Sequence, residues 1–421
     1  MTVHRSGFLR AGHLPTLIAA LLYFDVSFMV WIMLGPLAPY LREAFHLTAT
    51  EQGVMTAIPL LGGAAFRLVL GALGDRIGRR RTGLIGMAIT FIPLIIGATS
   101  ASTPAHLYLI GALLGVAGAS FAVALPLAGG HYPPAYQGLA MGIAGAGNSG
   151  TLFATWFAPR IAERFGWSAA FGLAMAPIAV VALLFAMMAR EPPAPRVRLT
   201  RAQLATVLRE ADTAWLSFLY SLTFGGFVGF ATFLTVFFHE QYGVSRVMAG
   251  GFATVVVVAG SLLRPVGGWL SDRIGGYRLL LGALGGFAIA VGAVAAAPPV
   301  SVAIMLLFVG MGLLGMGNGA IFQLVPQRFP RHLGLVTGIV GAAGGLGGFV
   351  LPTVLGIARD LTGTYNTGLV LVAAMAAIGF AVLLELGRRW SEEWHPDVVR
   401  DTGIFAYRKN TAPRLAAQDE A

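Results

Sequence analysis

The sequence predicts an all-α integral membrane protein with twelve transmembrane helices arranged as two six-helix repeats. Three observations support this fold class: the composition is apolar, the apolar residues form segments long enough to cross a bilayer, and the second half of the chain repeats motifs of the first. Of the 421 residues, 57% are hydrophobic and 11% are charged, and the mean hydropathy is +0.77. Soluble domains carry about 25% charged residues. The chain has no cysteine, which excludes a disulfide framework and a cysteine-ligated metal.

Twelve apolar segments are long enough to span a hydrocarbon layer about 30 Å thick. They cover residues 14–38, 52–73, 82–101, 105–130, 138–159, 167–189, 212–238, 247–270, 279–297, 301–325, 334–357 and 366–388. The first segment is longer and bulkier than a signal peptide, and no small-residue cleavage site follows it, so we expect it to be the first span. The chain has 57 glycines, as expected of helices that pack closely in a membrane.

Basic residues are distributed unevenly between the two sides of the membrane. If both termini are cytoplasmic, 21 of the 28 Lys and Arg residues lie in the termini and in the loops after even-numbered spans. The other side holds Arg42, Arg160, Arg164, Arg246 and Arg359. The positive-inside rule therefore predicts a multi-pass protein of the inner (plasma) membrane with both termini cytoplasmic. This bias accounts for the net charge of +10, and no nucleic-acid partner is expected.

The two halves of the chain are related by a nearly constant offset. "RLVLGALGDRIGRRR" from Arg67 aligns with "RPVGGWLSDRIGGYR" from Arg264, 197 residues later, and "GIAGAGNSG" at 142–150 matches "GIVGAAGGL" at 338–346. Two six-helix units in the same orientation are the parallel repeat of a major facilitator fold. We therefore expect six-helix bundles over 1–189 and 212–388, a cytoplasmic linker rich in proline and arginine over 190–211, and a cytoplasmic tail over 389–421.

The stretch "GALGDRIGRRR" matches the major facilitator loop signature between the second and third spans, and the second half carries a degenerate copy. An aspartate in this loop can accept hydrogen bonds from helix N-termini, and the arginines can pair across the interface between the halves. We interpret these residues as gating and topology residues that do not select the substrate: Asp75, Arg76, Arg79, Arg80, Asp272 and Arg273.

Two arginines, Arg67 and Arg264, lie inside apolar segments. Each precedes the aspartate of its loop by eight residues, or about 12 Å of helix, which places it close to the middle of the bilayer. An arginine at that depth costs at least about 2.5–3.5 kcal/mol. Ion pairing or snorkelling could lower this cost, but the spans offer one well-placed carboxylate, Asp25, and a second, Glu385, near a segment end. We favour a small planar anion, which arginine binds bidentately.

Aromatic residues follow one face of the seventh segment. Tyr220, Phe224 and Phe227 recur at i, i+4 and i+7, and the fourth segment contributes Phe121. Such a stripe can be core packing or lipid contact. Here it is flanked by glycines and includes a hydroxyl donor. Rings that flank a slot between two guanidinium groups would fit a flat, weakly hydrated anion and would fit a tetrahedral phosphate or sulfate poorly.

Glycine runs mark the fifth and eleventh segments. They allow tight helix packing, and bare backbone can also bring peptide amides close to an anion. Asn148 is the residue of the first run with a side-chain amide donor. The glycines of these two signatures are Gly142, Gly145, Gly147, Gly341, Gly344, Gly345 and Gly348.

The paired arginines, "AGAGNSGT", "GAAGGLGGF" and "YSLTFGGFVGF" together resemble the nitrate/nitrite porters of the major facilitator superfamily, over all twelve predicted spans. The resemblance implies that the two intramembrane arginines clamp the anion. Tyr220 and Asn148 would donate hydrogen bonds to it. Phe121 and Phe224 would sandwich it.

The expected function is therefore transport of nitrate, and of nitrite, by alternating access, with the chain working as a monomer and without a cofactor. Transport of another small monovalent anion or of a monocarboxylate is an alternative. A receptor that binds the anion without moving it is a rival of another class, and the C-terminal tail shows no recognisable signalling domain for it. We expect no enzymatic activity, because no mid-membrane histidine, cysteine or carboxylate pair is present.

Asp25, in "LLYFDVSFMVW" of the first span, is a carboxylate that a pure exchanger does not obviously need. In the empty carrier it could pair with one of the two arginines, and an anion that displaced it would favour its protonation. We therefore expect proton-coupled nitrate import, with nitrate/nitrite exchange as the alternative.

Overall fold

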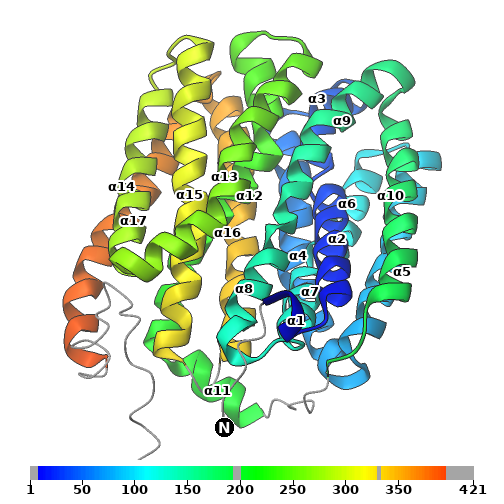
Figure 1. Cartoon of the computed structure of the whole chain (residues 1–421). Helices are drawn as coiled ribbons and strands as arrows, with labels where there is room; N and C mark the ends of the chain where they lie inside the picture. Colours follow the sequence, from blue (N-terminus) through cyan, green and yellow to red (C-terminus); the bar gives the residue numbers. More distant parts are fainter. Residues whose placement is uncertain (1–7, 193–200, 330–332, 395–421) are drawn as a thin grey trace, which may run out of the picture.

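The computed structural model describes residues 8–192, 201–329 and 333–394, and the regular structure in these ranges is helical (Figure 1). The N-terminal half comprises α1 (Phe8–Ala11), α2 (Leu14–Trp31), α3 (Leu34–Phe45), α4 (Ala49–Ile77), α5 (Arg79–Thr99), α6 (Pro104–Gly118), α7 (Phe121–Gly129), α8 (Pro134–Gly145), the 3₁₀ helix η1 (Ala146–Ser149), α9 (Gly150–Phe165) and α10 (Trp167–Met188). The C-terminal part comprises α11 (Arg201–Arg209), α12 (Ala211–Tyr242), α13 (Arg246–Ile274), α14 (Gly276–Val294), α15 (Val300–Arg328), α16 (Leu333–Thr362) and α17 (Asn366–Glu393). Residues 193–200 of the predicted linker and 395–421 of the predicted tail lie outside the described residues.

The predicted multi-span all-α fold is confirmed. Within the described ranges, eleven helical segments are long and apolar enough to cross a membrane. The predicted fifth span, 138–159, is interrupted, since α8 ends at Gly145, η1 follows, and α9 begins at Gly150. The first and fourth predicted spans are each divided in two, as α2 and α3 and as α6 and α7. A count of twelve spans fits this arrangement.

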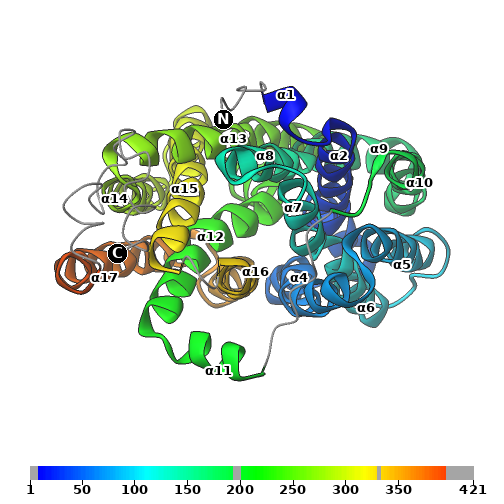
Figure 2. The same ribbon diagram turned by 60° about the horizontal axis from the view of Figure 1, so that its bottom comes forward.

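The two halves lie side by side, coloured blue to cyan-green and green to orange in Figures 1 and 2. Between them α4 packs on α16, α9 on α13 and α3 on α12. Glycines make these contacts close. A Cβ atom at Gly35 of α3 would lie 2.1 Å from the carbonyl oxygen of Thr232 in α12, and one at Gly356 of α16 would lie 2.4 Å from that of Ala49 in α4. The backbones therefore meet with no room for a side chain.

Among the described residues, the ion pairs that join the halves lie at one face of the molecule. We call the face that carries α1, α11 and the α4–α5 loop the linker face, and the other the opposite face (Figure 1). At the opposite face Arg42 pairs with Glu240 at 2.6 Å, and Glu43 pairs with Arg246. The carboxylate of Asp360 also accepts hydrogen bonds from the first two backbone amides of α4, at 3.1 and 2.7 Å. The halves are thus tied together at the opposite face.

Gly356→Val should disrupt the packing of α16 on α4, because the new side chain would meet the backbone of α4. We expect a loss of about 2 kcal/mol or more in stability, measured by thermal unfolding of the purified protein. Gly282→Val is the matched control, since a Cβ atom at Gly282 of α14 meets nothing within 4 Å. It should change stability by no more than about 0.5 kcal/mol. Equal losses would contradict the role of these glycine contacts.

Candidate functional site

Helices α4 and α13 place Arg67 and Arg264 at matching positions. Each helix is 29 residues long and carries its arginine at the nineteenth residue. A side-chain cap begins each helix, from Thr48 and from Ser245. Each ends at a glycine with positive φ, +100° and +91°, a conformation that favours glycine. The sequence repeat therefore becomes a spatial repeat, with one arginine contributed by each half.

Both guanidinium groups are buried and incompletely hydrogen-bonded. Arg67 is 3% exposed and Arg264 is 8% exposed. Nε of Arg67 donates to the carbonyl of Gly118 at 3.2 Å, and Nη1 donates to the carbonyl of Gly341, across the boundary between the halves. Nη2 of Arg264 donates to the Tyr220 hydroxyl at 3.4 Å. Nη2 of Arg67 and Nη1 of Arg264 have no partner in the described part of the chain. Each arginine therefore keeps one buried donor free.

Aromatic rings bring the two arginines into one cluster. Cζ of Arg67 lies 5.3 Å from the ring centroids of both Phe121 and Phe224. Cζ of Arg264 lies 6.0 and 5.9 Å from the same two rings. Tyr220 stacks on Phe224, with centroids 5.1 Å apart and an interplanar angle of 7°. The structure thus brings together both predicted clamp residues, both predicted rings and the predicted hydroxyl donor.

Trp31 of α2 also belongs to this cluster and was not expected from the sequence. Its ring lies 5.2 Å from Cζ of Arg67, and its indole nitrogen donates to the carbonyl of Pro59 at 2.6 Å. A signal for it was present, because Phe24, Phe28 and Trp31 recur at i, i+4 and i+7 and so share one face of α2. This second aromatic stripe resembles that of α12.

Phe322 of α15 is a further ring of the cluster that sequence reasoning missed. It lies 5.7 Å from Cζ of Arg264 and contacts Tyr220 edge-on, with centroids 5.1 Å apart. Phe308 of α15 lies fourteen residues before Phe322, and Phe329, directly after the helix, lies seven residues after it, but no aromatic residue lies three or four positions away. The periodic signal for this residue is therefore weak.

Asn148 lies in η1, which packs between α2 and α13. It is fully buried, and neither atom of its amide has a partner among the described residues. The Thr151 hydroxyl donates to the Asn148 carbonyl and lies 3.3 Å from the hydroxyl of Ser261, one turn before Arg264. Two further fully buried amides without a partner in the described ranges, Gln52 and Asn318, were not predicted. Asn318 lies one turn before Phe322, and at the offset of 197 it occupies the position of Phe121, a signal of the repeat that could have identified it.

The α16 glycines lie against the aromatic cluster. A Cβ atom at Gly344 would lie 2.7 Å from the Tyr220 ring, and one at Gly341 would lie 3.3 Å from the Phe121 ring. Gly345 and Gly348 pack on α4 and α12. In the other signature, Gly147 packs on α2 near Asp25, whereas Gly142 has open space around it and Gly145 only an ordinary contact, with Leu125. The second signature therefore contacts the cluster more closely than the first.

Comparison with known proteins agrees with this arrangement. Residues 19–352 match the family model of the Major Facilitator Superfamily. A probable nitrate/nitrite transporter, NarK2, of Mycobacterium tuberculosis (strain ATCC 25618 / H37Rv) is 35% identical over 87% of this chain and 95% of its own length. The nitrite extrusion protein of Bacillus subtilis (strain 168) is 30% identical over 89% and 94%. A probable nitrate transporter, NarT, of Staphylococcus haemolyticus is 32% identical over 88% and 95%.

The chain belongs to the nitrate/nitrite porter family of the major facilitator superfamily. Solved transporter structures confirm the fold. A partially occluded, inward-open structure of the xylose transporter XylE from E. coli gives a TM-score of 0.71 at 16% identity, over 88% of this chain and 98% of that one. An inward-facing bacterial homologue of the human lysosomal transporter Spinster gives 0.70 at 18% identity, over 90% and 98%. This porter is thus a multi-pass membrane transporter and not an enzyme.

Asp25 of the porter does not contact either clamp arginine in this conformation. Its Oδ1 accepts a hydrogen bond from the Ser149 hydroxyl at 2.6 Å, and the Gly150 backbone amide also binds the carboxylate. Between described residues, neither Arg67 nor Arg264 forms an ion pair with a carboxylate. Glu385 lies outside the site, exposed and 3.8 Å from Arg388.

The predicted gating residues lie at the linker ends of α4, α5 and α13. Asp75 pairs with Arg79 at 3.2 Å, within the N-terminal half. Arg80 donates to the carbonyl of Ala186 near the end of α10, at 2.6 Å. Arg273 lies over the Trp269 ring, with Cζ 3.8 Å from its centroid. Arg76 lies in the last turn of α4, and Asp272 lies near the end of α13. None of the six reaches the aromatic cluster, in keeping with a role apart from substrate selection.

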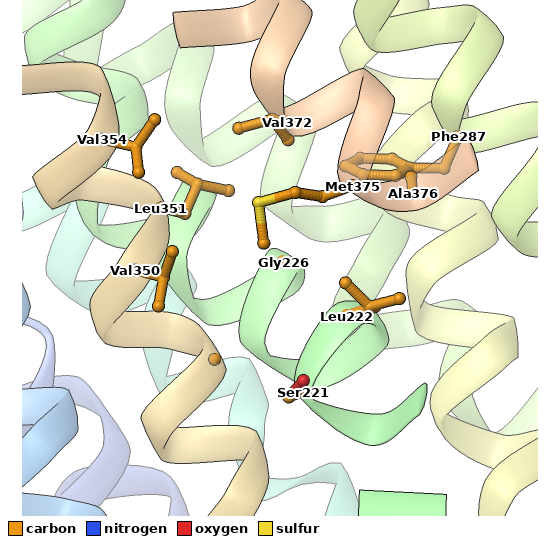
Figure 3. Close-up of a pocket in the computed structure, with 11 residues that line it drawn as sticks. Ser221, Leu222, Gly226, Phe287, Val350, Leu351, Val354, Val372, Met375 and Ala376 are labelled. Atoms are coloured by element: carbon orange, nitrogen blue, oxygen red, sulfur yellow. The ribbon is translucent and has the colours of Figure 1, made fainter. Parts of the chain in front are cut away.

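A small apolar pocket of about 30 Å³ lies elsewhere, between α12, α14, α16 and α17 (Figure 3). Its lining includes Leu222, Phe287, Leu351 and Met375, and its one polar side chain is that of Ser221, whose hydroxyl donates to the carbonyl of Phe218 at 2.7 Å. The lining residues that belong to α12 lie on other faces of that helix than Tyr220 and Phe224. They are Ser221, Leu222 and Gly226. The pocket offers no free donor to an anion, so the arginine cluster is the candidate site.

Arg264→Gln should stabilise the anion-free protein by about 1–2 kcal/mol, because it removes one of two buried charges that lack a carboxylate partner. The measurement is thermal unfolding in nitrate-free buffer. Arg328→Gln is the control, since Arg328 pairs with the buried carboxylate of Asp212. Arg328→Gln should lower the free energy of unfolding by about 3 kcal/mol, because Asp212 would lose its counter-charge. A loss of stability in Arg264→Gln would show that its charge is already compensated.

Proposed function

We propose that this porter carries nitrate, and nitrite, across the membrane by alternating access, with Arg67 and Arg264 as the clamp for the anion. The observation that carries the proposal is the pair of buried guanidinium groups, each with a free donor and neither paired with a carboxylate among the described residues. Intramembrane charge is functional by default. The names of the relatives, a probable nitrate/nitrite transporter, a probable nitrate transporter and a nitrite extrusion protein, support nitrate and nitrite as substrates.

The chemistry of the site suits a small planar anion. A guanidinium fork donates two parallel hydrogen bonds to a planar oxyanion, which an ammonium group cannot do. The rings of Phe121 and Phe224 lie beside both forks and offer flat apolar faces to a flat ion. The Tyr220 hydroxyl and the unpartnered amide of Asn148 are additional donors. Nitrate would leave the cluster with one net positive charge instead of two.

The position of the site between the halves supports a rocker-switch mechanism. Arg67 lies in the N-terminal half and Arg264 in the C-terminal half, so one anion can bind both halves at once. Arg67 already donates to Gly341 across the boundary. An anion that lowers the repulsion between the two arginines favours the approach of the halves around it. Because one chain supplies both halves of the site, a monomer is sufficient for transport.

The orientation follows from the distribution of basic residues. We propose that both termini and the linker face are cytoplasmic and that the protein lies in the inner (plasma) membrane. In that orientation, the ion pairs Arg42–Glu240 and Glu43–Arg246 close the side away from the cytoplasm. The present conformation is then one in which the outer side is closed.

Arg67→Lys and Arg264→Lys should each weaken nitrate binding at least about tenfold and abolish most nitrate uptake, because lysine keeps the charge but loses the fork. Binding to purified protein and uptake of labelled nitrate into proteoliposomes measure the two effects. Arg160→Lys, near the end of α9 and outside the cluster, is the matched control and should leave both unchanged. Near-normal uptake in both clamp variants would contradict the proposal. Cyanate, formate and lactate as competitors test other small anions.

We further propose that Asp25 couples nitrate import to protons. Ser149, which holds the Asp25 carboxylate, directly follows Asn148 in η1. An anion that binds the Asn148 amide would therefore act on the segment that hydrogen-bonds Asp25. Loss of those hydrogen bonds would leave a partly buried carboxylate without partners and favour its protonation. Nitrate/nitrite exchange is the alternative, and the name of the Bacillus relative, a nitrite extrusion protein, points to movement of nitrite in that relative.

Uptake into proteoliposomes with and without an inward proton gradient separates the two modes. With no internal anion, the wild type should accumulate nitrate when a gradient is present. Asp25→Asn should lose this accumulation and retain nitrate exchange, because the clamp is intact. Uptake that requires internal nitrite and ignores the gradient would show that the porter is an exchanger.

A further inference from the structure

A basic pocket opens at the linker face, where α4 ends, α5 begins and α10 ends. It has a volume of about 520 Å³ and is lined by Arg80, Arg81, Arg190, Glu191 and Met187, among others. The pocket belongs to the N-terminal half, and α5 and α10, which contribute to it, lie at the edge of that half away from the C-terminal half (Figures 1 and 2). It is separate from the arginine cluster at the boundary between the halves.

The pocket carries a surplus of positive charge. Its carboxylate, Glu191, accepts hydrogen bonds from the backbone amides of Arg79 and Arg80 at 2.7 and 3.0 Å and so caps the start of α5. The Arg80 guanidinium donates to the Ala186 carbonyl. Arg81 and Arg190 are exposed, and neither forms an ion pair within the part of the chain that the structure covers. Three arginines thus face one carboxylate that is already engaged.

The second half builds the equivalent helix junction differently. At the offset of 197, Tyr277 takes the place of Arg80, and Arg278 matches Arg81. A Cβ atom at Gly387 would lie 2.2 Å from the Tyr277 hydroxyl oxygen, so here a ring fills the space beside the last helix of the half. Arg388 and Arg389 directly follow Gly387, so the second junction is basic as well.

An exposed apolar stripe leads along α10 to the pocket. Val180, Leu183 and Met187 are 57%, 63% and 73% exposed, and their spacing of i, i+3 and i+7 places them on one face. Among the eleven spans found in the described ranges, α10 has the smallest buried share, 22% of its most apolar window. Met187 belongs both to this stripe and to the pocket lining. A ligand that fits both features has an anionic head and an apolar chain.

We propose that Arg80, Arg81 and Arg190 bind the phosphate of an anionic phospholipid from the adjacent leaflet, with an acyl chain along the α10 stripe. Guanidinium groups bind phosphate oxygens bidentately, and basic pockets at the cytoplasmic ends of membrane helices recognise anionic head groups. A soluble phosphate shares the head-group chemistry but leaves the stripe uncovered. The assignment is therefore to a lipid.

The test measures lipid retention on the detergent-purified full-length protein by native mass spectrometry, with phosphatidylglycerol and phosphatidylcholine of matched chains. The wild type should retain phosphatidylglycerol preferentially. Arg81→Gln with Arg190→Gln should weaken that binding about tenfold, whereas the corresponding double lysine variant should keep most of it. The double variant Arg10→Gln with Arg209→Gln removes two exposed charges from the same face outside the pocket and should bind as the wild type does. Equal loss in both glutamine pairs, or no lipid preference in the wild type, would overturn the proposal.

Inorganic phosphate and glycerol 3-phosphate separate the two sources of the head group. We expect neither to displace phosphatidylglycerol at millimolar concentration or to raise the melting temperature. The opposite result would be a melting temperature that inorganic phosphate raises only when Arg81 and Arg190 are present, in a protein that shows no preference for phosphatidylglycerol. That result would assign the pocket to a soluble phosphate and reject the lipid.

Discussion

Two buried guanidinium groups without a carboxylate partner in the described ranges dominate the energetics of this porter. Each costs at least about 2.5–3.5 kcal/mol to place at mid-membrane depth. Arg67 contacts three aromatic rings at 5.2–5.3 Å, and three cation–π contacts of about 1 kcal/mol each nearly offset that cost. The rings do not neutralise the two arginines, because a ring quadrupole carries no net charge. Under the proposed function, the transported anion supplies the missing negative charge.

The surrounding helices hold the two guanidinium groups close together and shield them from solvent. Glycines at the boundary let α4 approach α16, and the α16 glycines let the aromatic rings pack against bare backbone. Carboxylates are used at the opposite face instead, where Glu240 and Glu43 pair with arginines of the other half. The protein thus places these counter-charges at the opposite face, and no carboxylate of the described ranges pairs with the central arginines. This separation allows the substrate to supply the central negative charge.

Much of this site could be predicted from the sequence, because the internal repeat places matching residues in the two halves. An arginine in an apolar segment is rare, and its recurrence at an offset of 197 identified Arg67 and Arg264 as a pair. The i, i+4 spacing identified Tyr220 and Phe224, and the same spacing on α2 could have identified Trp31. Phe322 could not be found in this way, because its role depends on contacts between helices distant in sequence. The same limit applies to the hydrogen bond between Asp25 and Ser149, 124 residues apart, and to the interruption of the fifth span by η1.

The central claim is that one planar anion completes the hydrogen bonding of both arginines. A structure of the porter with nitrate bound tests it most directly. We predict planar density within about 3 Å of both Nη2 of Arg67 and Nη1 of Arg264, beside the rings of Phe121 and Phe224. Nitrate bound elsewhere, with either arginine instead paired to Asp25 in the same structure, would contradict the account.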